Sequence, residues 1–216
     1  MRGNFLALRA LARWPQWANK IDSADYATVD EALLGSSPAT EINLSLALNA
    51  GSDYLNFLAV ALLSKTLEEV SKMPPVVEAA QSVRLQIQGG LQEVARSIRI
   101  ECGDIAVFEA QQTADRIISR YSPYHFAPDA RYSVGVVRSL NSTKITAMRN
   151  PWLHFESVPL GKIFEQFGGG GHTRVASVLV PPDQQTKTSE FLTSIITAIH
   201  TADLRGAKAA GAPARD

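Results

Sequence analysis

The sequence predicts an α/β protein, with a helical first part, a connecting helix, and then an α/β domain built on a mixed sheet. Two observations carry this prediction. Apolar residues recur at helical spacing through roughly the first 97 residues. After them, short apolar runs alternate with turn residues such as Gly, Asp and Asn, which is typical of strands. The change of period predicts the main domain boundary.

Composition and charge are those of an ordinary globular chain. The 216 residues are 45% hydrophobic and 19% charged, with 21 Lys plus Arg against 21 Asp plus Glu. A neutral chain argues against a chain-wide surface for duplex DNA, whereas a local basic cleft stays open. The single cysteine, Cys102, excludes an internal disulfide and a cysteine-based zinc site. No apolar run approaches the roughly 18 residues of a membrane span. We therefore expect a cytoplasmic protein without a membrane partner.

The first part of the chain predicts helices separated by prolines. Leu55 to Leu63 is almost wholly apolar, which predicts burial on all sides. Pro74-Pro75 ends that element, and the amphipathic stretch that follows predicts a long connecting helix. The predicted helices are 5–14, 40–48, 53–72 and 76–96, within a first domain at 1–73 and a connecting segment at 74–97.

The second part predicts strands and helices in alternation. Gly103-Asp104 between two apolar runs predicts a hairpin, with Cys102 buried in its first strand. Pro159 suits the first turn of a short helix. The predicted strands are 98–102, 105–109, 132–137, 144–148 and 175–180, and the predicted helices are 113–120, 159–167 and 184–200. The domain spans 98–203, and 204–216 is expected to be a disordered tail.

The most informative motif is the run Gly168-Gly169-Gly170-Gly171, followed by His172, Thr173 and Arg174. One interpretation is a flexible linker. The run lies between a predicted helix and a predicted strand, however, which favours a loop whose backbone N–H groups approach an anion such as phosphate. His172 and Arg174 would add donors. A P-loop is excluded, because no Gly-Lys-Ser/Thr follows. Arg149, at the end of a predicted strand, is either a bidentate phosphate ligand or a solvent-facing strand end.

Together these residues resemble the DHH (Asp-His-His) phosphoesterase superfamily, which includes single-strand exonucleases, oligoribonucleases and hydrolases of cyclic dinucleotides. Gly168 to His172 match the Gly-Gly-Gly-Gly-His motif of its DHH-associated substrate-binding domain, and the resemblance covers roughly residues 98–202. It implies that His172 and Arg149 face the substrate phosphate. The sequence departs from the motif at Thr173, where the family often has Arg; here Arg174 stands one place later.

A second segment, residues 17–24, resembles the end of the family's catalytic domain and implies that Asp22 is a metal ligand. Without the resemblance, a helix cap or loop acid is the expected role of Asp22. The family's centre binds two divalent metals, usually manganese. The chain has no Asp-His-His triplet, and its four histidines are scattered (His125, His154, His172 and His200). We therefore expect residues 1–73 to be the C-terminal remnant of a catalytic domain that does not bind manganese stably alone.

Two functions follow from the sequence. In the first, the chain is the C-terminal portion of a metal-dependent DHH-type phosphoesterase, inactive alone, which grips the phosphate of a short nucleic acid or nucleotide for hydrolysis. In the second, it is a non-catalytic oligonucleotide-binding module that acts with a partner chain. A homodimer and association with a missing catalytic segment both stay open. His125, in the aromatic run 121–126, is expected to pack in a loop, with stacking on a base as the alternative.

Overall fold

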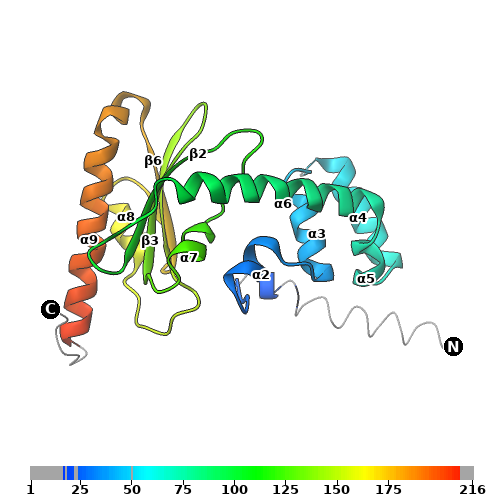
Figure 1. The fold of residues 1–216 in the computed structure, drawn as a ribbon, viewed down its shortest axis with the longest axis horizontal. Helices are drawn as coiled ribbons and strands as arrows, with labels where there is room; N and C mark the ends of the chain where they lie inside the picture. Colours follow the sequence, from blue (N-terminus) through cyan, green and yellow to red (C-terminus); the bar gives the residue numbers. More distant parts are fainter. Residues whose placement is uncertain (1–16, 18, 22–23, 50, 210–216) are drawn as a thin grey trace. The chain divides into compact units, whose positions relative to one another are not determined.

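The computed structural model describes residues 17, 19–21, 24–49 and 51–209, with side chains to residue 206. The chain divides into two compact units, residues 1–88 and 89–216, and the boundary falls inside helix α6 (Pro74–Ala95) (Figure 1). The helix expected at 5–14 lies outside the described residues.

The first unit is helical, as predicted. It contains α2 (Val29–Leu34), α3 (Pro38–Leu46), α4 (Ser52–Ser64), α5 (Leu67–Ser71) and the first part of α6. Its core joins α3, α4, α5 and α6 through Ile42, Leu58, Ala61, Val70 and Val76.

The single helix expected at 53–72 is two helices. The break occurs at Thr66, whose side chain accepts a hydrogen bond from the Glu69 amide while the Glu69 carboxylate accepts one from the Thr66 amide. This capping box starts α5 afresh. The expected burial of α4 on all sides is also wrong, since Val60 and Leu63 are 66% and 81% exposed.

The second unit is built on one six-stranded mixed sheet, in the order β1-β2-β3-β4-β6-β5. Only β2 and β3 pair in parallel; the other neighbours are antiparallel. The strands are β1 (Arg99–Glu101), β2 (Ile105–Gln111), β3 (Tyr132–Arg138), β4 (Thr143–Arg149), β5 (Gly170–Gly171) and β6 (Val175–Val180).

The predicted β1–β2 hairpin is confirmed, and its turn contains Cys102 as well as the predicted Gly103 and Asp104, because Glu101 pairs with Ile105. Cys102 and Gly103 have positive φ, at 52° and 85°. Cys102 is therefore exposed in a turn and not buried in a strand.

Helices cover both faces of the sheet. On one face, α8 (Leu160–Glu165) and α9 (Thr188–Ala209) pack on the largest apolar core, which includes Val134, Ile145, Phe164, Val178 and Ile195. A 3-10 helix, η1 (Pro182–Lys187), precedes α9. Residues 204–209, expected in a disordered tail, are helical.

On the other face, Val94 at the end of α6 packs with Phe108 and Val137. The helix expected at 113–120 is absent; Thr113 and Arg116 form an isolated bridge, and the helix in this region is α7 (Ser122–Phe126).

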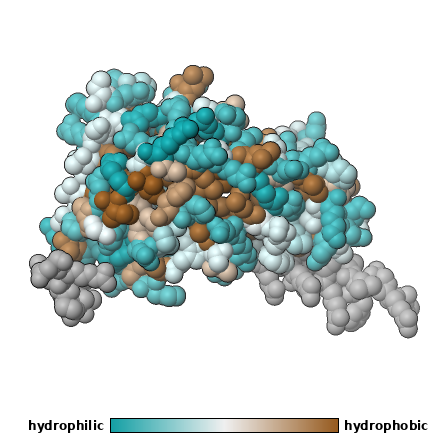
Figure 2. All heavy atoms as spheres, viewed as in Figure 1, coloured by the Kyte–Doolittle hydropathy of each residue, from teal (hydrophilic) through white to brown (hydrophobic). Residues whose placement is uncertain are grey.

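None of the described helices combines the length and the apolar character needed to cross a bilayer. Figure 2 shows apolar residues interrupted by hydrophilic ones on the face in view.

We expect Gly135→Ala to destabilise the second unit by about 1–3 kcal/mol, because overpacking a filled core has that cost. Gly135 lies opposite Phe108 in the β2–β3 register, and a Cβ there would stand 2.1 Å from the Phe108 ring. The measurement is the free energy of unfolding in urea. Gly206→Ala is the control, because a Cβ at Gly206 meets nothing within 4 Å. Equal urea midpoints for Gly135→Ala and wild type would contradict this packing.

Candidate functional site

Three of the residues singled out from the sequence meet at one end of the sheet. Strand β4 ends at Arg149, and its neighbour β6 begins at Val175, in register with Met148. The Arg149 amide donates to the Arg174 carbonyl at 2.8 Å. His172 lies in the turn that joins β5 to β6, and its amide donates to the Val175 carbonyl at 2.8 Å. The backbone thus brings the positions of Arg149, His172 and Arg174 together.

The half-buried Arg149 guanidinium organises the loop that follows it. It donates to the carbonyl oxygens of Asn150, Leu153 and Phe155, at 3.0, 2.8 and 3.0 Å. Its Cζ lies 4.4 Å from the centre of the Phe155 ring. Burial lowers the pKa of Arg149, and the charge of Arg174 lowers it further. Arg149 is therefore a fixed cation, and no carboxylate in the described part of the chain pairs with it.

His172 and Arg174 are exposed, and within the described ranges neither makes an ion pair. Their turn is held by the start of α8. The Leu160 amide donates to the Thr173 carbonyl at 3.1 Å, and the Gly161 amide donates to the His172 carbonyl at 3.0 Å. The turn is fixed by its backbone while its side chains face solvent.

The glycine run differs from the open row of amides that the sequence suggested. Gly168 has φ of 76°, and its amide donates to the Glu165 carbonyl, while the Gly169 amide donates to the Phe164 carbonyl. These two bonds form a Schellman motif that ends α8. The amides of Gly168 and Gly169 are thus already bonded and do not face a ligand. Gly170 and Gly171 form β5 instead of a loop.

The same glycines permit close packing between backbones. A Cβ at Gly161 would stand 2.6 Å from the Gly171 carbonyl oxygen, and a Cβ at Gly169 would stand 2.5 Å from the Ser177 carbonyl oxygen. Contacts this short are sterically excluded for real side chains. Gly161 is therefore required for α8 to pack against β5, and Gly169 for the end of α8 to pack against β6, whether or not a ligand binds.

A network that the sequence analysis missed lies beside Arg149. Phe155 contacts two guanidinium groups, with Arg131 at 4.3 Å and Arg149 at 4.4 Å from its ring centre. Arg131 forms an ion pair with Asp203 of α9. The Tyr132 hydroxyl donates to Asp203 at 2.9 Å and accepts from the Val158 amide at 3.1 Å. The partners are up to 72 positions apart, so no local pattern could indicate them.

Asn150 is a second residue that the sequence did not single out as functional. It is fully buried, and its amide nitrogen donates to the carbonyls of Pro128 and Ala130, at 2.9 and 2.8 Å. Its side-chain oxygen accepts from the Trp152 amide at 3.0 Å. Asn150 therefore joins the segment after α7 to the end of β4.

The expected metal ligand, Asp22, lies outside the described residues. Among the residues that are described, no three His, Cys, Asp or Glu side chains are close enough to hold a metal ion. That part of the chain does not fit a two-metal centre. His125 and His154 are exposed and His200 is half-buried.

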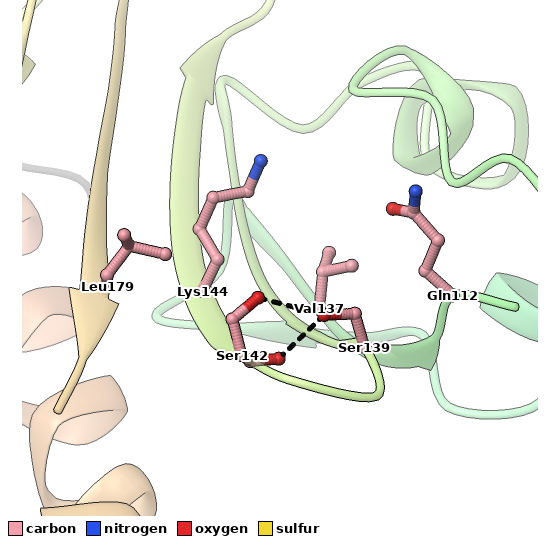
Figure 3. Close-up of a pocket in the computed structure, with 6 residues that line it drawn as sticks. All are labelled: Gln112, Val137, Ser139, Ser142, Lys144 and Leu179. Carbon is pink, nitrogen blue, oxygen red and sulfur yellow. Dashed lines mark hydrogen bonds between the residues drawn. The ribbon is translucent and has the colours of Figure 1, made fainter. Parts of the chain in front are cut away.

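A shallow pocket of about 250 Å³ lies at the opposite end of the sheet (Figure 3). It contains none of the residues expected to bind substrate, and Lys144 of β4 and Leu179 of β6 line it.

Comparison with known proteins places the fold. No family model matches the sequence, and no curated protein matches it. Among solved structures, the pGpG-specific phosphodiesterase PggH of Vibrio cholerae matches at TM-score 0.65 and 16% identity, over 85% of this chain and 65% of PggH. The DHH domain of a protein assigned to a family of ribosomal proteins matches at TM-score 0.52 and 14% identity, over 84% of this chain and 45% of that one. The chain has a DHH-family fold and spans 65% or less of the length of these two proteins.

We expect Gly168→Ala to destabilise the protein by about 1–2 kcal/mol, the cost of a left-handed conformation for a residue with a side chain. Gly170→Ala is the matched control within the same run, since a Cβ there meets nothing within 4 Å. Unfolding in urea, followed by circular dichroism, measures both. Equal losses for the two variants would contradict the capping role of Gly168.

We expect stability to fall as the pH rises above about 10, the ordinary pKa of tyrosine. Burial, with the Asp203 carboxylate adding to it, raises the pKa of Tyr132 to about 12. A raised pKa means that the fold favours the neutral phenol, so its contribution is complete below pH 10 and is lost as the pH approaches 12. Burial also raises the pKa of Tyr124. Urea unfolding of wild type and Tyr132→Phe between pH 8 and pH 11 tests this. The variant should show a shallower pH dependence, and an equally steep one would contradict the assignment.

Proposed function

We propose that this chain, which has a DHH-family fold, is the substrate-binding portion of a phosphoesterase and binds a phosphate of a short nucleic acid or nucleotide. One observation carries the proposal. Arg149, His172 and Arg174 share one end of the sheet, and within the described ranges none of them is paired with a carboxylate. Unpaired cations gathered on fixed backbone are a favourable site for an anion.

Each of the three side chains would have a separate role in binding the phosphate. Arg149 uses three N–H groups on loop carbonyls, and a guanidinium has five, so two remain for a phosphate oxygen. Arg174 is exposed and can turn its planar fork toward the phosphate. His172 can donate from a ring nitrogen. The site binds and orients the phosphate and supplies no nucleophile of its own.

The choice of substrate is supported by the similarity to PggH, whose description is pGpG-specific. A 5′-phosphorylated dinucleotide is therefore the probe of choice. For hydrolysis, the family resemblance implies manganese, which would activate water when bound. The described residues do not provide its ligands. The proposal for the chain is accordingly limited to binding of the phosphate.

The test is titration of fluorescently labelled pGpG with the wild type, Arg174→Ala and His172→Ala. We expect Arg174→Ala to weaken binding at least tenfold, because a hydrogen bond to a charged group contributes about 1.5–3 kcal/mol. His172→Ala should weaken it less, and added salt should weaken binding by the wild type. Lys187→Ala is the control, an exposed cation beyond the opposite end of β6.

Absence of binding by the wild type would overturn the proposal, and so would equal affinity of Arg174→Ala and Lys187→Ala. Addition of manganese to the same samples tests the expectation that the chain is inactive alone. Binding without release of GMP is the expected result, and release of GMP would contradict that expectation.

A further inference from the structure

We infer that Asp203 of α9 is a positioning residue for Arg149, the half-buried cation of the candidate phosphate site. This inference rests on the proposed function and deepens it, because it names what holds the guanidinium in place. The feature to be explained is a carboxylate that is only 12% exposed and bonds to two residues beside the site, Arg131 and Tyr132. Its effect would reach Arg149 through the side chain of Phe155.

Arg149 and Tyr132 lie on the same face of the sheet. They are partners in the β3–β4 register, and directly opposite residues of neighbouring strands project to the same side. That face is the one covered by α9, because Tyr132 belongs to the same core as Ile199. The rings of Tyr132 and Phe155 meet edge to face, 5.3 Å apart, so the loop after β4 returns to this face as well.

Phe155 makes two contacts with Arg149. Its carbonyl oxygen accepts a hydrogen bond from Nη2 of Arg149 at 3.0 Å, and its ring centre lies 4.4 Å from Cζ of Arg149. Nη2 also donates to the Leu153 carbonyl at 2.8 Å. Since Nη2 carries only two N–H groups, both are used on this loop. The position of Phe155 therefore determines where the guanidinium plane and its two remaining N–H groups point.

Asp203 bonds to two side chains that contact the Phe155 ring. The Cζ atom of Arg131 lies 4.3 Å from the centre of that ring, and the Tyr132 ring makes the edge contact with it. Asp203 forms an ion pair with Arg131 and accepts a hydrogen bond from the Tyr132 hydroxyl at 2.9 Å. One carboxylate thus fixes two neighbours of the ring, and through the ring it fixes Arg149.

Positioning and simple charge predict opposite effects of losing this carboxylate. A negative charge near the site repels a phosphate, so its removal alone should strengthen binding. Loss of positioning should weaken binding instead. The chain offers a matched control, because Asp104 is a second carboxylate on the same nitrogen of Arg131, at 3.5 Å. The single hydroxyl proton of Tyr132 is donated to Asp203, so Asp104 shares the charge of Asp203 but not this bond.

The experiment measures the affinity of labelled pGpG for wild type, Asp203→Asn and Asp104→Asn. We expect Asp203→Asn to weaken binding about threefold to tenfold, up to the loss of one hydrogen bond to a charged group. Asp104→Asn should leave the affinity unchanged or raise it. Asp203→Glu restores a carboxylate and should bind pGpG more tightly than Asp203→Asn.

A double-mutant cycle separates positioning from a general loss of structure. Phe155→Leu changes no charge and should weaken pGpG binding by a factor similar to that of Asp203→Asn. In the Phe155→Leu background, Asp203→Asn should have less than a twofold further effect, because the ring through which it acts is gone. Should Asp203→Asn fold poorly by circular dichroism, Tyr132→Phe takes its place, since it removes the hydroxyl bond to Asp203 without changing a charge.

Unchanged or tighter binding of pGpG by Asp203→Asn, or by the Tyr132→Phe variant used instead, would overturn the inference and leave the phosphate site intact. Equal weakening by Asp203→Asn and Asp104→Asn would overturn it as well, and so would fully additive effects in the cycle. Failure of the wild type to bind pGpG would instead overturn the proposed function, and the inference with it.

Discussion

The close approach of two backbones, at Gly161 in α8 and Gly171 in β5, is the constraint on which the candidate site depends. Even one methyl group at Gly161 would overlap the Gly171 carbonyl oxygen, at 2.6 Å. Because the backbones meet, the amides of Leu160 and Gly161 reach the carbonyls of Thr173 and His172. Those bonds fix the turn between β5 and β6, and with it the positions of His172 and Arg174. The glycines act through packing, and in the proposed function the side chains after them bind the ligand.

The end of β4 poses a different problem, because the segment after it has no regular structure over 150–159 and its carbonyl groups need partners. Arg149 supplies hydrogen bonds to three of them, and the buried Asn150 donates to the carbonyls of Pro128 and Ala130 in the segment after α7. The loop and the cation therefore stabilise each other. The Arg149 side chain has a structural role and two further N–H groups, whereas the Arg174 side chain is exposed and makes no hydrogen bond or ion pair with the residues that the structure describes.

Local patterns predicted most of the fold. The β1–β2 hairpin, β3, β4, β6, α6, α8 and α9 follow from periodicity and turn residues, which are properties of neighbouring positions, whereas α2, α7 and β5 were not predicted. Thr66 and Glu69 have the spacing of a capping box, from which the break between α4 and α5 could have been predicted. The apolar run before them instead suggested one continuous helix. The capping role of Gly168 could not be predicted, since it depends on where α8 ends. The contacts of Asp203 with Arg131 and Tyr132 are long-range, and only the folded chain reveals them.

The arginines at the end of the sheet that carries Arg149 differ in whether a carboxylate neutralises their charge. Arg131 and Arg149 lie on the same ring, Phe155, at almost equal distances. Arg131 forms ion pairs with Asp203 and Asp104, so its positive charge is neutralised by carboxylates of the same unit. The hydrogen-bond acceptors of Arg149 are neutral carbonyls, and Arg149 is repelled by the like charge of the nearby Arg174. A guanidinium stays protonated in proteins, so this repulsion cannot be relieved by loss of a proton. In the proposed function, a bound phosphate would relieve this repulsion at Arg149 and Arg174, while Arg131 keeps its ion pairs with Asp104 and Asp203.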